Sequence, residues 1–183
     1  PVQFLIDRFE ASYQFLGNDG TLFYFRTDLD APRGKVVAID LRQPDKAHWK
    51  TILPEGEDTL QAVTLMGKQM AVVTLHNATS RVCIYTLKGE FVKEIPLPTL
   101  GTCSGFVGRR SQEEFFYGFT SFVYPYTIYR YDTRTGESTL FHAPRIEGLD
   151  PSQYETKQVW YRSKDGTRVP MFITHRKDLQ RHG

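Results

Sequence analysis

A group of four short strand-like runs recurs along this chain at a nearly constant interval, and this repeat constrains the fold more than any other feature. Its second strands carry Phe23, Ala71 and Phe115 at matching positions, 48 and 44 residues apart. A four-stranded unit that recurs at this spacing is typical of the blades of a β-propeller. The sequence therefore predicts an all-β fold, a partial β-propeller of about three four-stranded antiparallel blades followed by a β-hairpin.

The strands are predicted from alternating or continuous apolar runs that end at turn residues such as Gly17–Gly20 and Lys88–Glu90. A β-sandwich with a similar number of strands is the alternative architecture. The predicted ranges are 13–16, 22–26, 35–41 and 49–53 in the first blade, 61–66, 69–75, 81–87 and 91–95 in the second, and 102–107, 114–119, 127–131 and 138–142 in the third.

Three blades do not close a ring, because known propellers contain about four to eight. The chain would then either assemble with copies of itself or be an excised part of a longer polypeptide. The chain starts at Pro1 instead of an initiator Met and stops soon after a final hairpin, which favours excision. That hairpin is predicted from two runs rich in β-branched and aromatic residues, 159–161 and 169–173, around the turn Ser163–Gly166.

Composition argues against several classes of partner. The formal net charge is only +2, so neither nucleic acid nor an anionic membrane is expected to bind. No apolar run approaches the roughly 20 residues that span a bilayer. Cys83 and Cys103 lie in apolar strand-like runs and are predicted to be free buried thiols, which favours a reducing, cytoplasmic setting. The sequon Asn77–Thr79 is interpreted as a turn.

The sequence carries no complete catalytic, metal or cofactor motif. Gly101–Gly105 comes nearest to a nucleophile elbow, but its first glycine stands three residues before Ser104 instead of two, and a strand surrounds it. The histidines, at positions 48, 76, 142, 175 and 182, include no pair at metal-ligand spacing. Gly105–Gly108 lacks the Lys-Ser/Thr of a phosphate-binding loop. We therefore expect no catalytic, cofactor-binding or metal-binding residue, and no cofactor.

Aromatic residues gather between positions 115 and 126. Large aromatic side chains pack between neighbouring propeller blades, and blade packing is the favoured interpretation, with an exposed stacking platform for a ligand as the alternative. The cluster contains Phe115, Phe116, Tyr117, Phe119, Phe122, Tyr124 and Tyr126.

Several segments match a known family more specifically than the blade pattern does. They are Leu5–Glu10 with Tyr13, Gly20–Phe23, Phe115–Phe122 followed by Pro125, Gly148–Tyr154, and the hairpin string SKDGTRVPMFITH at 163–175. Together they resemble the prolyl oligopeptidase family over essentially the whole chain. The FTSF block at 119–122 and the hairpin are the most specific parts, and the related oligopeptidase B and acylaminoacyl peptidases fit less well.

The resemblance implies a full-length serine peptidase that cuts short peptides after proline, with a seven-bladed propeller covering an α/β-hydrolase domain. In such an enzyme a Ser–His–Asp triad attacks the carbonyl while an oxyanion hole stabilises the intermediate. Residues 1–150 would be three blades, and 151–183 the linker and first hairpin of a truncated peptidase domain. No triad residue can be assigned here, so this chain is expected to be inert alone.

Two hypotheses about function follow. In the first, the partners are the rest of the same polypeptide and short proline-containing peptides. In the second, the chain is a non-enzymatic, propeller-type binding module that assembles with itself or with a partner, because open strand edges invite pairing with another chain.

Overall fold

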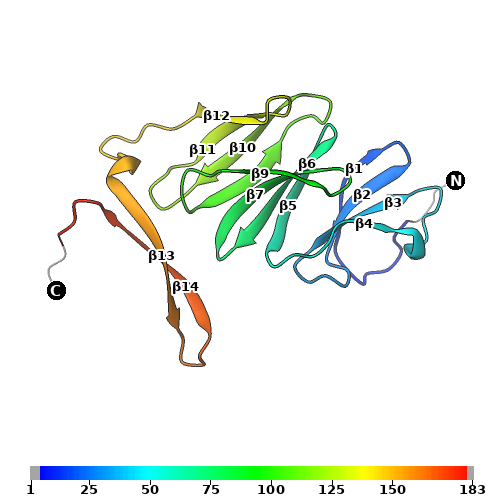
Figure 1. The fold of residues 1–183 in the computed structure, drawn as a ribbon, viewed down its shortest axis with the longest axis horizontal. Coiled ribbons are helices and arrows are strands. Elements are labelled where there is room, and N and C mark those ends of the chain that lie inside the picture. The colour runs from blue at the N-terminus through cyan, green and yellow to red at the C-terminus, as the bar shows by residue number, and fades with distance from the viewer. Residues whose placement is uncertain (1–4, 181–183) are drawn as a thin grey trace.

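The computed structural model describes residues 5–180 as three four-stranded antiparallel sheets and a separate two-stranded sheet (Figure 1). The first blade contains β1 (Tyr13–Asp19), β2 (Leu22–Thr27), β3 (Lys35–Asp40) and β4 (Lys50–Leu53). The second contains β5 (Thr59–Met66), β6 (Gln69–His76), β7 (Thr79–Thr86) and β8 (Phe91–Ile95). The third contains β9 (Thr102–Val107), β10 (Glu114–Thr120), β11 (Thr127–Asp132) and β12 (Glu137–His142).

The final hairpin pairs β13 (Tyr154–Arg162) with β14 (Arg168–Arg176). Two short 3-10 helices, Lys46–His48 and Pro151–Gln153, lie before β4 and β13. Within residues 5–180, no helix is long and apolar enough to cross a membrane.

Each blade is a meander in which strands that are consecutive in sequence are also neighbours in the sheet. The first strands of the blades meet, since β1 contacts β5 and β5 contacts β9. The sheets therefore fan out from their first strands, as propeller blades do, and do not form a sandwich. The predicted partial propeller of three blades is confirmed, and the described sheets form no closed ring.

Two apolar cores hold the blades together. The core between the first and second blades contains Val36, Leu60 and Met70, and the core between the second and third contains Val82, Phe115 and Tyr131. The middle blade is covered on both faces, so Met70–Val73 in β6 forms a continuous buried run. By contrast, all six residues of β12 are exposed, because β12 is the outer edge strand of the third blade.

Close backbone approaches also join the blades. A Cβ atom added to Gly89, in the turn between β7 and β8, would lie 1.9 Å from the carbonyl oxygen of Ile52 in β4. Arg110, from the third blade, donates hydrogen bonds to the carbonyl oxygens of Gly67 in the second blade and Asn18 in the first. Neighbouring blades are therefore fixed by side-chain packing and by these polar contacts at their turns.

The predicted strand bounds hold within a few residues, with two corrections. The first strand does not end at Leu16: β1 continues to Asp19 through a β-bulge between Phe15 and Gly17. Gly17 permits this because its φ is +145° and the Leu65 side chain of the second blade fills the space where its Cβ would stand. The final hairpin is also longer than predicted, because the ladder starts at the pair Tyr154–Arg176.

The aromatic cluster divides between packing and exposure. Phe115, Tyr117 and Phe119 are buried, as the blade-packing interpretation predicts. The interpretation is wrong for Phe122 and Tyr126, which are 67% and 54% exposed. Phe122 points toward the hairpin, and Tyr126 lies over Gly118 of its own blade because that residue has no side chain to block the ring.

Candidate functional site

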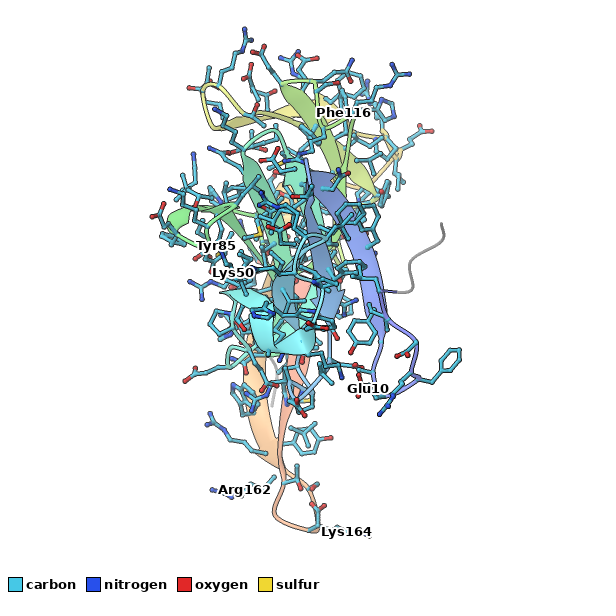
Figure 2. All side chains as sticks on the ribbon, turned by 90° about the vertical axis from the view of Figure 1, so that its right-hand side faces the viewer. Glu10, Lys50, Tyr85, Phe116, Arg162 and Lys164 are labelled. Carbon is cyan, nitrogen blue, oxygen red and sulfur yellow. The ribbon has the colours of Figure 1, made fainter. Side chains whose placement is uncertain are left out.

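One end of the propeller carries the hairpin, and we call it the hairpin face. Because antiparallel strands reverse direction, the turn after the second strand and the loop after the fourth strand of every blade lie at the same end. The hairpin face thus comprises loops 28–34, 54–58, 77–78, 96–101 and 121–126. Figure 2 shows the hairpin tip, marked by Arg162 and Lys164, projecting beyond the blades at the end opposite Phe116.

Two contacts join the hairpin to this face. The Gln158 side chain of β13 donates a hydrogen bond to the carbonyl oxygen of Asn77, in the turn between β6 and β7. The Phe172 ring of β14 packs on Phe122, in the loop after β10, with ring centroids 5.5 Å apart. A cavity of about 260 Å³ lies beside these rings and is lined by Ala78, Leu100 and other residues of the second and third blades.

The turn that receives Gln158 has an unusual backbone. Asn77 and Ala78 have φ angles of +47° and +64°, which is the geometry of a two-residue type I′ hairpin turn. Asparagine tolerates this conformation, whereas alanine is strained there because its Cβ crowds the backbone. Thr79 Oγ1 donates to the carbonyl oxygen of His76 at 2.9 Å and closes the turn.

A cleft of about 380 Å³ opens beside this turn, between the first and second blades. His76 Nδ1 lies 2.8 Å from Asp58 Oδ1, and its Nε2 lies 3.1 Å from the Asn77 side-chain nitrogen. A proton on Nδ1 satisfies both contacts, since Nδ1 then donates to the carboxylate and Nε2 accepts from the amide. Further along the cleft wall, Arg81 pairs with Glu94 at 2.7 Å.

Cys83 lines the same cleft, which raises the question of a Cys–His–Asp constellation. In the ladder Cys83 stands opposite Val72, four residues from His76. At about 3.4 Å per residue, the backbones of Cys83 and His76 are separated by roughly 14 Å along the sheet, too far for a hydrogen bond between thiol and imidazole. Burial also raises the pKa of the Cys83 thiol, which keeps it protonated. The cleft therefore holds no activated nucleophile.

Ser104 lies in strand β9, not at a strand-to-helix elbow. Its hydroxyl accepts a hydrogen bond from the Gly118 N–H at 3.0 Å and lies 3.2 Å from the Tyr126 hydroxyl. These contacts bridge β9 and β10 where their register shifts, and they involve no general base. The geometry gives Ser104 a structural role.

The other described histidines lie on different elements. In the hairpin, His175 Nε2 lies 3.1 Å from Glu155 Oε1, directly across the ladder. His142 ends β12, His48 ends a 3-10 helix, and His182 lies outside the described residues. No group of three or more potential metal ligands occurs in residues 5–180. Both cysteines are free and buried, as predicted, and burial raises the pKa of the Cys103 thiol to about 11.

Comparison with known proteins fits this architecture. A family model described as the N-terminal β-propeller domain of prolyl oligopeptidase matches residues 1–144, which contain all three blades. The chain belongs to the prolyl oligopeptidase family. The match ends before the linker and hairpin, so the predicted boundary near residue 150 stays a prediction.

Relatives in this family are much longer than the chain. A prolyl endopeptidase of Elizabethkingia meningoseptica is 32% identical over 179 residues, which are 98% of this chain and 25% of the relative. A prolyl endopeptidase of Dictyostelium discoideum is 33% identical over 96% of this chain and 24% of its own length. The chain thus spans about a quarter of the curated relatives that it matches.

Solved structures agree with these relatives. A chain from a structural and mechanistic study of two prolyl endopeptidases superposes with a TM-score of 0.86 at 39% identity, over 98% of this chain and 26% of that one. Ligand-free prolyl oligopeptidase B from Galerina marginata superposes with a TM-score of 0.88 at 30% identity, over 96% of this chain and 26% of that one. Both comparisons include nearly the whole chain, hairpin included.

The two contacts between hairpin and blades were not foreseen from the sequence. The string around Phe122 matches the family, but it does not show that the ring leaves the blade to meet Phe172. Gln158 carries no sequence signal at all. The paired positive φ angles at 77 and 78 depend on tight pairing of β6 with β7, which the apolar pattern indicates only coarsely.

Proposed function

We propose that this chain is part of the propeller of a longer serine peptidase, which hydrolyses short peptides after proline, and that the chain alone is inert. Membership of the prolyl oligopeptidase family carries this proposal. The second part is supported by the two nucleophile candidates, Ser104 and Cys83, since neither is paired with a general base. The remaining blades and the hydrolase domain would be partners within one polypeptide.

Within that protein, residues 1–150 would supply three blades, and 151–183 the linker and first hairpin of the peptidase domain. The hairpin leaves the third blade on the hairpin face, so the peptidase domain would stand over that face. The blades would then restrict access to the catalytic site and admit small peptides. Two free buried thiols favour a cytoplasmic setting for the whole protein.

A fluorophosphonate probe tests this proposal, because it labels activated serines covalently. We expect no labelling of the isolated chain, and labelling of a single serine in an extended protein that also contains the remaining blades and the hydrolase domain. Ser104→Ala in the extended protein should leave labelling unchanged. Labelling of Ser104, or an extended protein that never reacts and never cleaves a proline peptide, would refute the proposal.

The binding-module hypothesis is the second candidate, and one observation favours it. The uncovered side of the third blade exposes Val107 and Phe141, next to the open edge of β12. Such an edge with apolar neighbours pairs readily with another chain. This hypothesis predicts association that grows with concentration in light scattering, whereas a strictly monomeric chain would count against it.

A further inference from the structure

One rung of the hairpin ladder contacts the blades from both of its strands. Gln158 and Phe172 stand directly opposite each other in the pairing of β13 with β14, so their side chains lie on one face of the hairpin. Gln158 reaches the second blade at Asn77, and Phe172 reaches the third blade at Phe122. One rung is thus tied to two blades, through one contact from each strand.

The turn that makes the second-blade contact is held in place by hydrogen bonds. The Asn77 carbonyl points outward from a two-residue turn, and neighbouring groups hold that turn in place. His76 bridges the Asn77 amide to Asp58, and Thr79 closes the turn from the other side. The strained φ of +64° at Ala78 is maintained by the ladder on both sides.

The third-blade contact is supported in the same way. The loop that presents Phe122 is closed by a hydrogen bond from the Ser121 N–H to the Tyr124 carbonyl oxygen at 3.0 Å. Thr120 Oγ1 donates to the same oxygen at 3.1 Å, and the Tyr124 N–H donates to Ser121 Oγ at 3.1 Å. Both partners of the hairpin are therefore turns with little freedom of their own.

Beyond this rung the hairpin is more open to solvent. Trp160, Tyr161 and Met171 are 36%, 49% and 42% exposed, and the tip projects away from the blades (Figure 2). An element fixed at one rung and open beyond it can turn about that rung when a contact breaks. Two contacts to different blades restrict such rotation more than one contact would.

We propose that the contacts Gln158–Asn77 and Phe122–Phe172 form a two-point clamp that sets the angle of the hairpin on the propeller. The effect of this clamp on peptide selection rests on the proposed function. If the hairpin begins the peptidase domain, the clamp holds that domain over the hairpin face and limits how far the two parts separate. Asn77, Phe122, Gln158 and Phe172 are then positioning residues, and they determine the length of peptide that is admitted.

Spin labels can report the hairpin angle in the chain itself. We would label Lys50→Cys in β4 and Lys164→Cys at the hairpin tip, two exposed sites marked in Figure 2. Burial raises the pKa of both native thiols, which keeps them protonated and slow to react. Electron–electron resonance would then give the distribution of distances between blade and tip, with a narrow distribution expected for the clamped hairpin.

Gln158→Ala and Phe122→Ala each remove one contact. For a contact worth about 1 kcal/mol, each lowers the ratio of clamped to released hairpin about fivefold, and the double variant broadens the distribution further. Phe91→Ala and Gln112→Ala are the matched controls, because they remove exposed side chains of the same kinds away from the hairpin. They should leave the distance distribution unchanged. Circular dichroism confirms that the blades stay folded. A double variant with a distribution as narrow as the controls would overturn the clamp.

An assay of cleavage by the extended protein tests the positioning role separately from the proposed function. With the double variant, we expect the rate on long proline peptides to rise relative to the rate on short ones, a ratio that simple destabilisation would not raise. Unchanged peptide selection in an active protein would overturn the positioning role. If the unaltered extended protein cleaves nothing, the proposed function fails, and the spin-label distances still decide the clamp.

Discussion

Gly89→Ala tests how closely the first two blades approach each other. Gly89 has a φ of +86°, and its missing Cβ would lie 1.9 Å from the Ile52 carbonyl oxygen. The positive φ costs an alanine about 1–2 kcal/mol. The new methyl group must also move more than about 1 Å away from a backbone oxygen, and forced overpacking of this kind costs about 1–3 kcal/mol. The sum predicts that the free energy of unfolding falls by about 2–5 kcal/mol.

Gly67→Ala is the matched control. Gly67 lies in a turn of the same blade with a φ of +56°, but nothing lies within 4 Å of its missing Cβ. Only the backbone strain then applies, and we expect a loss of about 1–2 kcal/mol. Urea denaturation followed by circular dichroism measures both values. Equal losses for the two variants would refute the close approach of the blades.

Three further predictions concern the core, a turn and the pH dependence of stability. Phe115→Ala, which empties a fully buried site between blades, should lower the free energy of unfolding by about 3–5 kcal/mol in urea titrations. Ala78→Gly relieves the strained turn and should raise the free energy of unfolding by about 1 kcal/mol, seen as a higher midpoint of thermal unfolding. A lower midpoint would contradict the strain. Burial raises the pKa of Cys103 from 9.0 to about 11, because the folded protein favours the neutral thiol. The stability that this preference contributes is therefore complete below pH 9 and is lost as the pH rises toward 11. Cys103→Ala should flatten that part of a urea-midpoint profile.

The blade repeat was predictable because it depends on local patterns. Strand pairs such as β6 and β7 follow from continuous apolar runs on either side of a short turn, and their bounds agree with the structure within a few residues. The β-bulge near Gly17 could not be foreseen, since it depends on Leu65 from the next blade filling a space beside it. The longer hairpin was missed because polar residues such as Lys157 interrupt its apolar pattern.

For the candidate site, the sequence could predict only which residues do not act as a nucleophile. Ser104 could be rejected as a nucleophile from the spacing of its glycines, and its contacts to Gly118 and Tyr126 agree. The clamp could not be predicted, because Asn77 and Gln158 are 81 residues apart and meet only once three blades have fanned out. Contacts between distant loops depend on tertiary arrangement, which local periodicity does not encode.

Cleavage of a proline-containing peptide tests the central claim most directly. The isolated chain and the extended protein, which also contains the remaining blades and the hydrolase domain, would be incubated with the same short peptide, and the products identified by mass spectrometry. We predict no products from the chain alone, and cleavage on the carboxyl side of proline by the extended protein. Products from the isolated chain, or cleavage by the extended protein at other residues only, would contradict this account.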